Sequence, residues 1–290
     1  MKGALVVGCG YTGTRLAARL LRMGFRVVGT TRSEERAGEL EAAGIEPLIG
    51  ELNDRETLRR IERLGLALVA YFVPPQDEGD PLPQVLAAAA AAPLEAFLYA
   101  SSTSVYGDRG GDWVDETTMV KPETLEAEAR HAAERIIVGA ARSDQAPTRV
   151  CRITGIYGPG RTLRRALESG DYVLVKDHDT WVNRIHVDDL VSGLIAAWLR
   201  GGDGRVYNLV DDQPHRASEF ANLAADLHVL PRPEWIGLSD AVERFGDARL
   251  GRKLSNKRVR SLLLKEDLGL DLKYPSYRVG LPAAVEEEKG

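Results

Sequence analysis

A segment near the N-terminus has the residue types and spacing that bind the pyrophosphate of a dinucleotide. Its residues are Gly8, Cys9, Gly10, Tyr11, Thr12 and Gly13. Gly8 permits a tight turn, Gly10 lets a pyrophosphate approach the backbone, and Gly13 lets the following helix pack closely on the preceding strand. The free N–H groups at the start of that helix, at Tyr11 and Thr12, then face the anion. The segment therefore predicts a phosphate-binding loop, with a glycine-rich turn that binds no ligand as the alternative.

The segment after the second apolar run distinguishes between two dinucleotides. An NAD site of this kind carries a carboxylate about 20 residues beyond the glycine loop, where it holds the ribose 2′-hydroxyl. This chain has no carboxylate there until Glu34 and instead presents Thr31, Arg32 and Ser33. The Arg32 guanidinium can pair with a 2′-phosphate, and the hydroxyl of Thr31 or Ser33 can donate to it. We therefore expect NADP to be preferred over NAD. A solvated Arg32, or a different dinucleotide-like ligand, is the alternative.

Alternating apolar strands and amphipathic helices position these residues. Short apolar runs, each followed by a helical repeat, are typical of a parallel sheet covered on both faces. We expect strands at 4–7, 25–28, 45–49, 67–73, 96–100 and 148–153, and helices at 12–23, 34–41, 54–63, 82–91 and 123–141. The predicted fold class is α/β, a Rossmann-type doubly wound parallel sheet with a smaller C-terminal lobe. We expect residues 1–160 to form the dinucleotide-binding core and residues 161–290 the substrate lobe, with segments returning to the core in one structural unit.

Composition and charge narrow the classes of partner. The chain has 290 residues and a formal net charge of -5, so no overall basic field attracts nucleic acid or an anionic membrane. No apolar stretch approaches the roughly 18 residues that span a bilayer. The two cysteines, Cys9 and Cys151, do not make a disulfide framework and fit a reducing cytoplasm. With five histidines and no Cys-x-x-Cys pair, the sequence indicates no metal site.

Further short segments follow one another along the chain. Their occurrence together in this order is a more specific signal of a protein family than any single segment. They are Glu51-Leu52 after the third strand, Val73-Pro74 after the fourth, 101–107 (SSTSVYG) after the fifth, 152–160 (RITGIYGPG) after the sixth, 184–190 (RIHVDDL) and 274–281 (YPSYRVGL). Together they resemble the extended short-chain dehydrogenase/reductases, the family of NAD(P)-dependent epimerases and dehydratases. The resemblance implies that Glu51 and Leu52 lie under the adenine, and that Val73 and Pro74 lie near the cofactor ribose.

The same resemblance implies further cofactor and substrate contacts. It assigns Ser101, Thr154 and Ile156 to the cofactor. The candidates for substrate contact are Thr103, Tyr157, Arg161, Asn183 and Arg184. Nucleotide-sugar enzymes of the family commonly carry an asparagine and an arginine where this chain has Gly155 and Val182. We therefore do not expect the usual sugar-diphosphate pose, and we expect another small-molecule substrate.

The catalytic residues of the family are only partly matched. Family chemistry uses a Tyr-x-x-x-Lys pair on the helix after the fifth strand, and a Ser or Thr that here matches Ser102. Alignment of the helix puts Glu126 at the tyrosine position and Arg130 at the lysine position. An i,i+4 pair between them would keep Glu126 ionised, so that it could only accept a proton. A plain surface ion pair is the alternative role, and Tyr106 is the nearest other phenol that could transfer a proton.

Two functions follow from these observations. The first is an NADP-preferring oxidoreductase or epimerase-like enzyme that acts on a small molecule. The second, motivated by the missing tyrosine and lysine, is a catalytically inactive NADP(H)-binding sensor or structural subunit. We also expect a homodimer, because the family commonly dimerises through two helices that match 82–91 and 123–141, and alanine-rich faces on these helices allow close approach.

Overall fold

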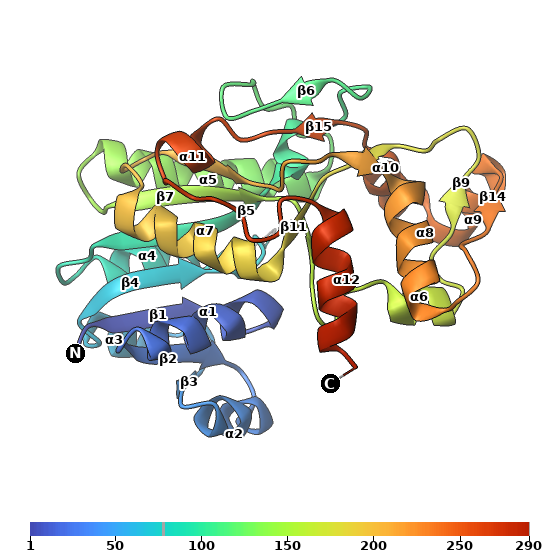
Figure 1. Cartoon of the computed structure of the whole chain (residues 1–290). Helices are drawn as coiled ribbons and strands as arrows, with labels where there is room; N and C mark the ends of the chain where they lie inside the picture. The colour runs from blue at the N-terminus through green and yellow to red at the C-terminus, as the bar shows by residue number, and fades with distance from the viewer. Residues whose placement is uncertain (77–78, 290) are drawn as a thin grey trace.

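A seven-stranded parallel sheet forms the centre of the molecule (Figure 1). The computed structural model describes residues 1–76 and 79–289. In spatial order the strands are β12 (Val206–Leu209), β7 (Thr148–Ile153), β5 (Ala96–Ser102), β4 (Leu66–Tyr71), β1 (Gly3–Val7), β2 (Arg26–Thr31) and β3 (Glu46–Ile49). The direction of winding reverses between β1 and β4, where sheets of this topology bind ligands. The predicted Rossmann-type α/β class is confirmed.

Helices cover both faces of the sheet. Successive strand residues point to opposite sides, so an apolar strand presents apolar side chains on both faces, and each face is buried by helices. One face packs against α1 (Tyr11–Arg22), α2 (Glu34–Ala42) and α7 (Val187–Arg200), and the other against α3 (Arg55–Glu62), α4 (Leu82–Ala89) and α5 (Leu125–Arg142). On β1, Val6 belongs to the first core cluster, whereas Leu5 and Val7 belong to the second. All three side chains are fully buried, which explains why the strand is apolar at every position.

Local sequence signals set where the helices begin. Ser33, Asp54 and Thr124 each accept a hydrogen bond from a backbone N–H in the first turn, and so cap α2, α3 and α5. The N-cap residue of α1 is instead Gly10, which has no side chain that could accept such a hydrogen bond. The strands and helices predicted from the sequence are all present, with ends displaced by at most three residues.

The second half of the chain alternates between the sheet and a lobe beside it (Figure 1). Strand β12 pairs in parallel with β7, and α7 packs on the same core cluster as α1. The other elements are η1 (Thr103–Tyr106), β6 (Trp113–Val114), β8 (Gly155–Tyr157), α6 (Arg164–Glu168), β9 (Leu174–Val175), β10 (Trp181–Val182), β11 (Arg184–His186), β13 (His215–Arg216), α8 (Ala217–His228), β14 (Trp235–Ile236), α9 (Leu238–Phe245), α10 (Asp247–Leu254), β15 (Arg258–Val259), α11 (Leu263–Glu266) and α12 (Tyr277–Glu287). The short strands pair as β8 with β11, β9 with β14, β10 with β13, and β6 with β15.

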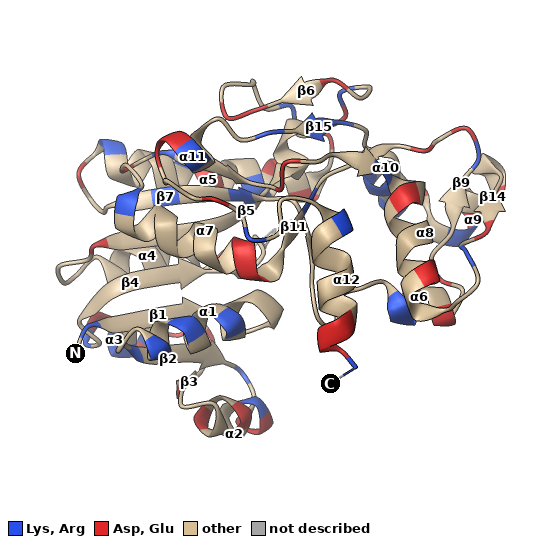
Figure 2. Cartoon of the chain, in the orientation of Figure 1, with Lys and Arg blue, Asp and Glu red and all other residues tan. Residues whose placement is uncertain are grey.

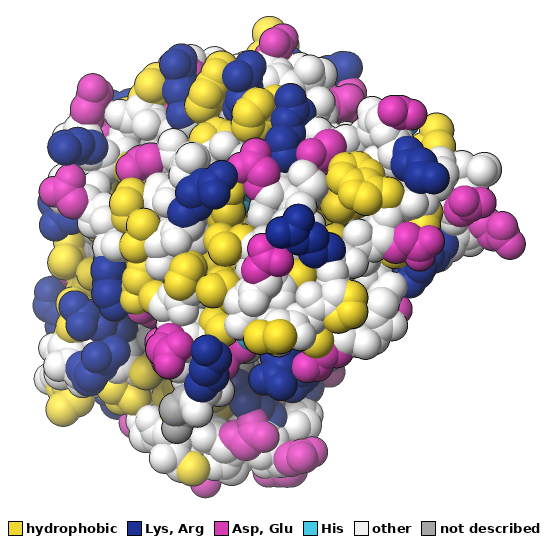
Figure 3. Space-filling view, turned by 45° about the vertical axis from the view of Figure 1, so that its right-hand side comes forward, with side chains coloured by type: hydrophobic (Ala, Val, Ile, Leu, Met, Phe, Trp, Pro, Cys, Tyr) yellow, Lys and Arg dark blue, Asp and Glu magenta, His cyan; other side chains and the backbone are white. Residues whose placement is uncertain are grey.

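Charged side chains are spread over the surface. Figure 2 shows basic residues along α1 and mostly acidic residues along α2. On the face drawn in Figure 3, basic and acidic side chains are interspersed rather than separated. Among the residues that the structure describes, no helix is long and apolar enough to cross a membrane. The same residues contain no group of three or more His, Cys, Asp or Glu side chains that could hold a metal ion.

Candidate functional site

Three adjoining cavities follow the carboxyl ends of the strands. We call them the outer cavity, beside β2 and β3, the middle cavity, beside the glycine loop, and the inner cavity, which faces the C-terminal lobe. The outer and middle cavities share Gly8, Gly10 and Phe72, and the middle and inner cavities share Ser102, Ile153 and Thr154. The inner cavity has a volume of about 560 Å³. Shared walls make the three cavities one continuous groove.

The glycine loop has the geometry that close contact with a phosphate requires. Gly8 has φ of +92°, and its N–H donates to Thr30 Oγ1 at 3.1 Å. A Cβ on Gly13 would lie 2.4 Å from the Gly8 carbonyl oxygen, so only glycine allows the helix to pack this closely. A Cβ on Gly10 would meet nothing within 4 Å, and would instead occupy the groove. The loop therefore leaves open the space at the start of α1, beside Tyr11 and Thr12, where a pyrophosphate would lie.

The end of β2 brings the predicted specificity residues to the outer cavity. Thr31 and Arg32 line it, and the Arg32 side chain has no hydrogen bond or ion pair with any residue that the structure describes. Ser33 does not line this cavity, because its hydroxyl caps α2 by accepting from the Arg36 N–H at 3.1 Å. The same cavity is also lined by Glu51, Leu52, Val73 and Pro74. The structure thus brings both segments that the resemblance assigns to the adenosine half into one cavity.

A second arginine at this end was not anticipated from the sequence. Arg36 Nη2 donates to the Cys9 carbonyl oxygen at 2.6 Å and to Thr14 Oγ1 at 2.9 Å. Its other guanidinium nitrogen pairs with Glu39. Arg36 lies in the first turn of α2, four residues after Arg32, and no local motif marks it. Arg32 lines the outer cavity, whereas Arg36 binds the backbone of the glycine loop.

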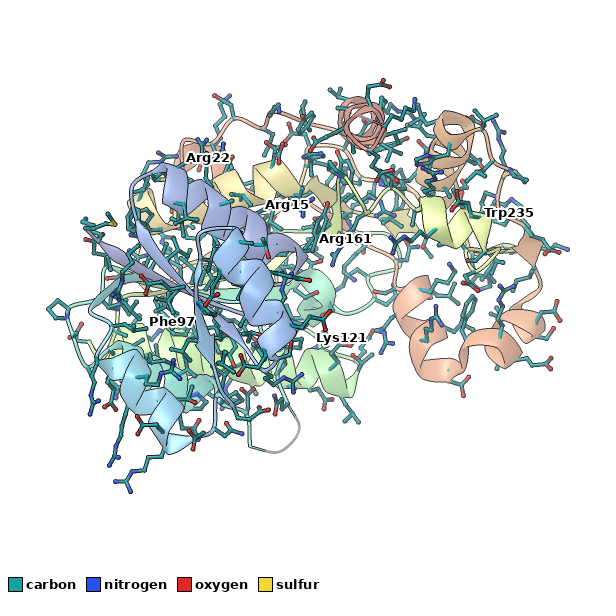
Figure 4. The ribbon with its side chains drawn as sticks, turned by 90° about the horizontal axis from the view of Figure 1, so that it is seen from below. Arg15, Arg22, Phe97, Lys121, Arg161 and Trp235 are labelled. Carbon is teal, nitrogen blue, oxygen red and sulfur yellow. The ribbon has the colours of Figure 1, made fainter. Side chains whose placement is uncertain are left out.

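Tyr11 fixes one wall of the middle cavity. Its hydroxyl donates to the Pro159 carbonyl oxygen at 2.9 Å. The guanidinium carbons of Arg15 and Arg161 lie 3.9 and 4.2 Å from the centre of its ring. Figure 4 labels both arginines, which lie near each other. Arg161 lines the middle cavity rather than the inner one, so its position fits a cofactor contact better than the predicted substrate contact.

Ser102 lies where the middle and inner cavities meet. Its Oγ accepts a hydrogen bond from the Ser104 N–H at 3.1 Å, so its own hydrogen remains able to donate to a ligand. Ser101 also lines the middle cavity, but its hydroxyl donates to Glu134 Oε1 at 2.6 Å. Thr154 and Ile156 line the same cavity, and their predicted contact with a cofactor stays a prediction.

Tyr106 belongs to a buried polar network instead of the groove. Its side chain is fully buried, and its hydroxyl accepts from Arg152 Nη1 at 3.0 Å and donates to Asn208 Oδ1 at 2.9 Å. The Arg152 guanidinium also binds both oxygens of Glu134, at 3.0 and 2.7 Å. Burial raises the pKa of the Tyr106 phenol. The proton-transfer role considered for Tyr106 therefore has no support in the geometry, because the hydroxyl is committed and lines none of the three cavities.

The pair predicted on α5 forms, and one of its members reaches the groove. Arg130 Nη2 lies 3.6 Å from Glu126 Oε1, and Arg252 Nη1 lies 3.6 Å from the other oxygen. Arg130 lines the middle cavity with its side chain 14% exposed. Glu126 is half exposed and lines none of the three cavities. Two guanidinium groups thus hold Glu126 outside the groove, whereas Arg130 contributes positive charge inside it.

The inner cavity contains some of the predicted substrate residues. Thr103, Asn183 and Arg184 line it. The Asn183 amide is already committed, since it donates to the Lys257 carbonyl oxygen at 2.9 Å and accepts from the Val259 N–H at 2.6 Å. Asn183 therefore positions β15. Sequence reasoning did not identify Lys257, which also lines this cavity, because nothing in the local pattern 252–260 marks a site.

Tyr157 does not take the predicted place on the cavity wall. Its side chain is fully buried, and its ring packs edge-on against His186 and Phe220, with centroids 5.2 and 5.7 Å away. A Cβ on Gly280 would lie 2.2 Å from the Tyr157 hydroxyl oxygen, which shows how closely α12 approaches it. Tyr157 therefore joins the lobe to the core, and the geometry gives no support for a substrate contact.

Comparison with known proteins identifies two family matches within the chain. Residues 82–209 match the model of the NAD dependent epimerase/dehydratase family, and residues 4–73 match the TrkA-N domain. The chain therefore contains an epimerase/dehydratase family domain. The structure of a functionally unknown conserved protein from Silicibacter pomeroyi is 33% identical over the whole of both chains, with a TM-score of 0.84. Protein YeeZ from Escherichia coli strain K12 is 25% identical over 285 residues, which cover 95% of this chain and 97% of YeeZ.

A more distant structure shows how far the fold extends. The dTDP-glucose 4,6-dehydratase from Bacillus anthracis, solved in complex with NAD, superposes with a TM-score of 0.81 at 18% identity, over all of this chain and 97% of that one. At this identity the likeness concerns the fold. This chain shares with that dehydratase the parallel central sheet of the Rossmann-type fold.

Proposed function

We propose that the protein binds NADP along the continuous groove and acts as an oxidoreductase on a small molecule in the inner cavity. The observation that carries the proposal is the shared wall at Ser102, where a site for a dinucleotide and a separate cavity meet. The adenosine would lie in the outer cavity, the pyrophosphate against the start of α1, and the nicotinamide in the middle cavity. The NAD held by the dehydratase from Bacillus anthracis supports a nicotinamide cofactor of this kind.

The residues at the junction support carbonyl–alcohol chemistry. When bound, the nicotinamide would exchange a hydride with a substrate carbon. Ser102 would donate a hydrogen bond to the reacting oxygen, since its hydrogen is not used within the protein. Arg130 would keep positive charge beside the cofactor. Glu126, held between two guanidinium groups, stays outside the groove, so the proton would come from water or from another group in the inner cavity.

The preference for NADP rests on the positive charge at the end of β2. Arg32 lacks a partner among the described residues, and no carboxylate occupies the 2′-hydroxyl position that an NAD site uses. We expect Arg32→Ala to weaken NADPH binding about 10- to 100-fold, the loss of a charge-assisted contact, and to leave NADH binding nearly unchanged. Titration followed by reduced-nicotinamide fluorescence measures both constants.

A matched control separates this site from general charge effects. Arg22→Ala removes another exposed arginine, at the far end of α1, and should bind NADPH as the natural chain does. If the natural chain binds neither NADPH nor NADH, the proposed function is wrong. Equal loss of affinity in the two variants would instead remove the assignment of Arg32 to the 2′-phosphate.

A second function is favoured by one specific observation. The positions aligned with the family's tyrosine and lysine carry Glu126 and Arg130, and the Glu126 carboxylate is neutralised by Arg130 and Arg252. A protein that holds NADP(H) as a sensor or structural subunit would keep tight binding without hydride exchange. Incubation of the protein with deuterated NADPH and a panel of aldehydes and ketones distinguishes the two, because any deuterium in an alcohol product identifies an enzyme.

We also propose a homodimer, formed through α4 and α5. The alanines expected to allow close helix contact mostly face the sheet: Ala88, Ala89, Ala127 and Ala133 are buried. The outward face of α5 instead presents Ile136, which is 42% exposed, and Leu125, which is 78% exposed. These two exposed apolar side chains are the feature that supports this interface.

A further inference from the structure

The inner cavity carries an excess of positive charge. Its basic lining residues are Arg184, Arg252, Lys253 and Lys257, and its acidic ones are Asp108 and Glu123. Both carboxylates are already engaged. Glu123 binds Lys121 Nζ at 2.8 Å and accepts from the Asp108 N–H, while Asp108 accepts from the N–H groups of Gly110 and Asn256. Lys257 is buried, and Arg184 is partly buried with its Nε fully enclosed, so these two basic groups are the informative ones.

Arg184 is a partly buried cation that forms no ion pair with any residue that the structure describes. Its guanidinium stacks on the Phe220 ring, 3.6 Å from the centre, and its buried Nε has no hydrogen-bond partner among the same residues. The charge of Asp211 acts on Arg184, but the two side chains form no ion pair, and burial raises the pKa of the Asp211 carboxyl to about 8. Burial also lowers the pKa of Arg184 itself. A guanidinium that is desolvated but unpaired costs free energy, which a bound anion would offset.

Lys257 is the second such cation. Its side chain is 7% exposed, and the ammonium donates to the Ser255 hydroxyl at 2.7 Å. The Asn183 amide holds the Lys257 backbone, so the side chain is anchored at the cavity wall. Burial lowers the pKa of Lys257 to about 8, although the charges of Asp108 and Glu123 act in the opposite direction. A lysine in this state is still mostly protonated near neutral pH and would gain from an anionic partner.

We propose that the inner cavity binds a substrate that carries a carboxylate or phosphate group, with Arg184 and Lys257 as its counter-charges. Binding of the anionic group does not depend on the proposed function. The inference rests on the proposed function only for the reacting oxygen at the opposite end of the substrate, which Ser102 would contact. Gly155 lines the same cavity beside the guanidinium, and a Cβ there would be in ordinary contact with Arg184 Nη1, at 3.6 Å. The pose therefore differs from the one expected of nucleotide-sugar enzymes, whose asparagine and arginine positions are Gly155 and Val182 here.

Protection of Lys257 from acetylation tests the proposal without any dinucleotide. The full-length protein is treated with trace acetic anhydride in sodium chloride, sodium malonate or sodium phosphate at equal ionic strength, and modification of each lysine is measured by peptide mass spectrometry. An anion bound beside Lys257 favours its protonated, unreactive form and covers it. We expect malonate or phosphate to slow acetylation of Lys257 about tenfold, whereas exposed Lys265 should react equally in all three salts. Malonate and phosphate distinguish a carboxylate from a phosphate substrate.

Variants show whether Arg184 shares the anion. Arg184→Met keeps an apolar stem against Phe220 and should abolish protection of Lys257, and Arg184→Gln provides a second neutral side chain if the first variant does not fold. Arg135→Met, on the exposed side of α5, is the matched control and should retain protection. Circular dichroism confirms that each variant is folded. The proposal is overturned if neither anion protects Lys257 beyond chloride, or if protection persists without the Arg184 charge. Because no dinucleotide is present, these outcomes are independent of NADPH binding.

Discussion

The hydroxyl of Tyr106 illustrates how a motif residue can have a structural role. It lies between Arg152 and Asn208 in a fully buried network. We expect Tyr106→Phe to lower the free energy of unfolding by about 1–3 kcal/mol, because a buried donor and acceptor lose their partner. NADPH affinity should be unchanged. Urea denaturation and fluorescence titration of the same preparation measure the two quantities, and loss of affinity with unchanged stability would return Tyr106 to the site.

Asp211 should make stability depend on pH in an unusual direction. Burial raises the pKa of its carboxyl from 3.8 to about 8, so the folded state holds a proton that the unfolded state releases. Stability from this group is therefore present below the unfolded pKa and is lost as the pH rises toward about 8. Asp211→Asn, which is neutral throughout, should gain stability relative to the natural chain between about pH 5 and about pH 8. Denaturation midpoints of both proteins at the two pH values check this. The prediction is contradicted if the difference in stability between Asp211→Asn and the natural chain is the same at both pH values.

Single residues were predictable from the sequence only where their neighbours in the chain define their role. The glycine loop and Arg32 follow directly from spacing along β1, α1 and β2. Lys257 reaches the inner cavity because Asn183 holds its backbone from 74 residues away, a contact with no local signature. Tyr106 and Tyr157 have the right motifs, but their burial depends on Arg152 and α12 and could not be read from those motifs.

At the scale of elements, the junction of the glycine loop and α1 gives a test of the dinucleotide site. Gly10 has φ of -83°, which alanine can adopt, and its Cβ would enter the groove without touching the protein. We expect Gly10→Ala to fold and to weaken NADPH binding by at least about tenfold, through contact with the pyrophosphate. Gly38→Ala, in α2, is the control, since its Cβ also meets nothing within 4 Å and lies away from the groove. Equal affinities in both variants would exclude the proposed position of the pyrophosphate.

The elements themselves divide into those set by local pattern and those set by distant pairing. A strand that is followed directly by an amphipathic helix, such as β1 followed by α1, appears in the sequence as an apolar run and then a helical repeat of apolar residues. Strand β12 was not located, because it joins β7 at the edge of the sheet after more than 50 intervening residues. The two-residue strands of the lobe, such as β15, exist only through their partners and are too short to produce a periodic signal.

At the scale of the whole molecule, the free surface of α5 leads to a prediction about assembly. Ile136 is 42% exposed on the outward face of α5, and a stable dimer buries about 800 Å² on each partner. We expect the natural chain to sediment as a dimer and Ile136→Glu as a monomer, because a charge would be desolvated at the centre of the contact. Leu199→Glu places the same charge on α7, where leucine is 54% exposed, and should remain dimeric. A monomeric natural chain would exclude the interface, and dissociation by both variants would place it elsewhere. Since the groove lies at the carboxyl ends of the strands, the monomeric variant should still bind NADPH with the affinity of the natural chain.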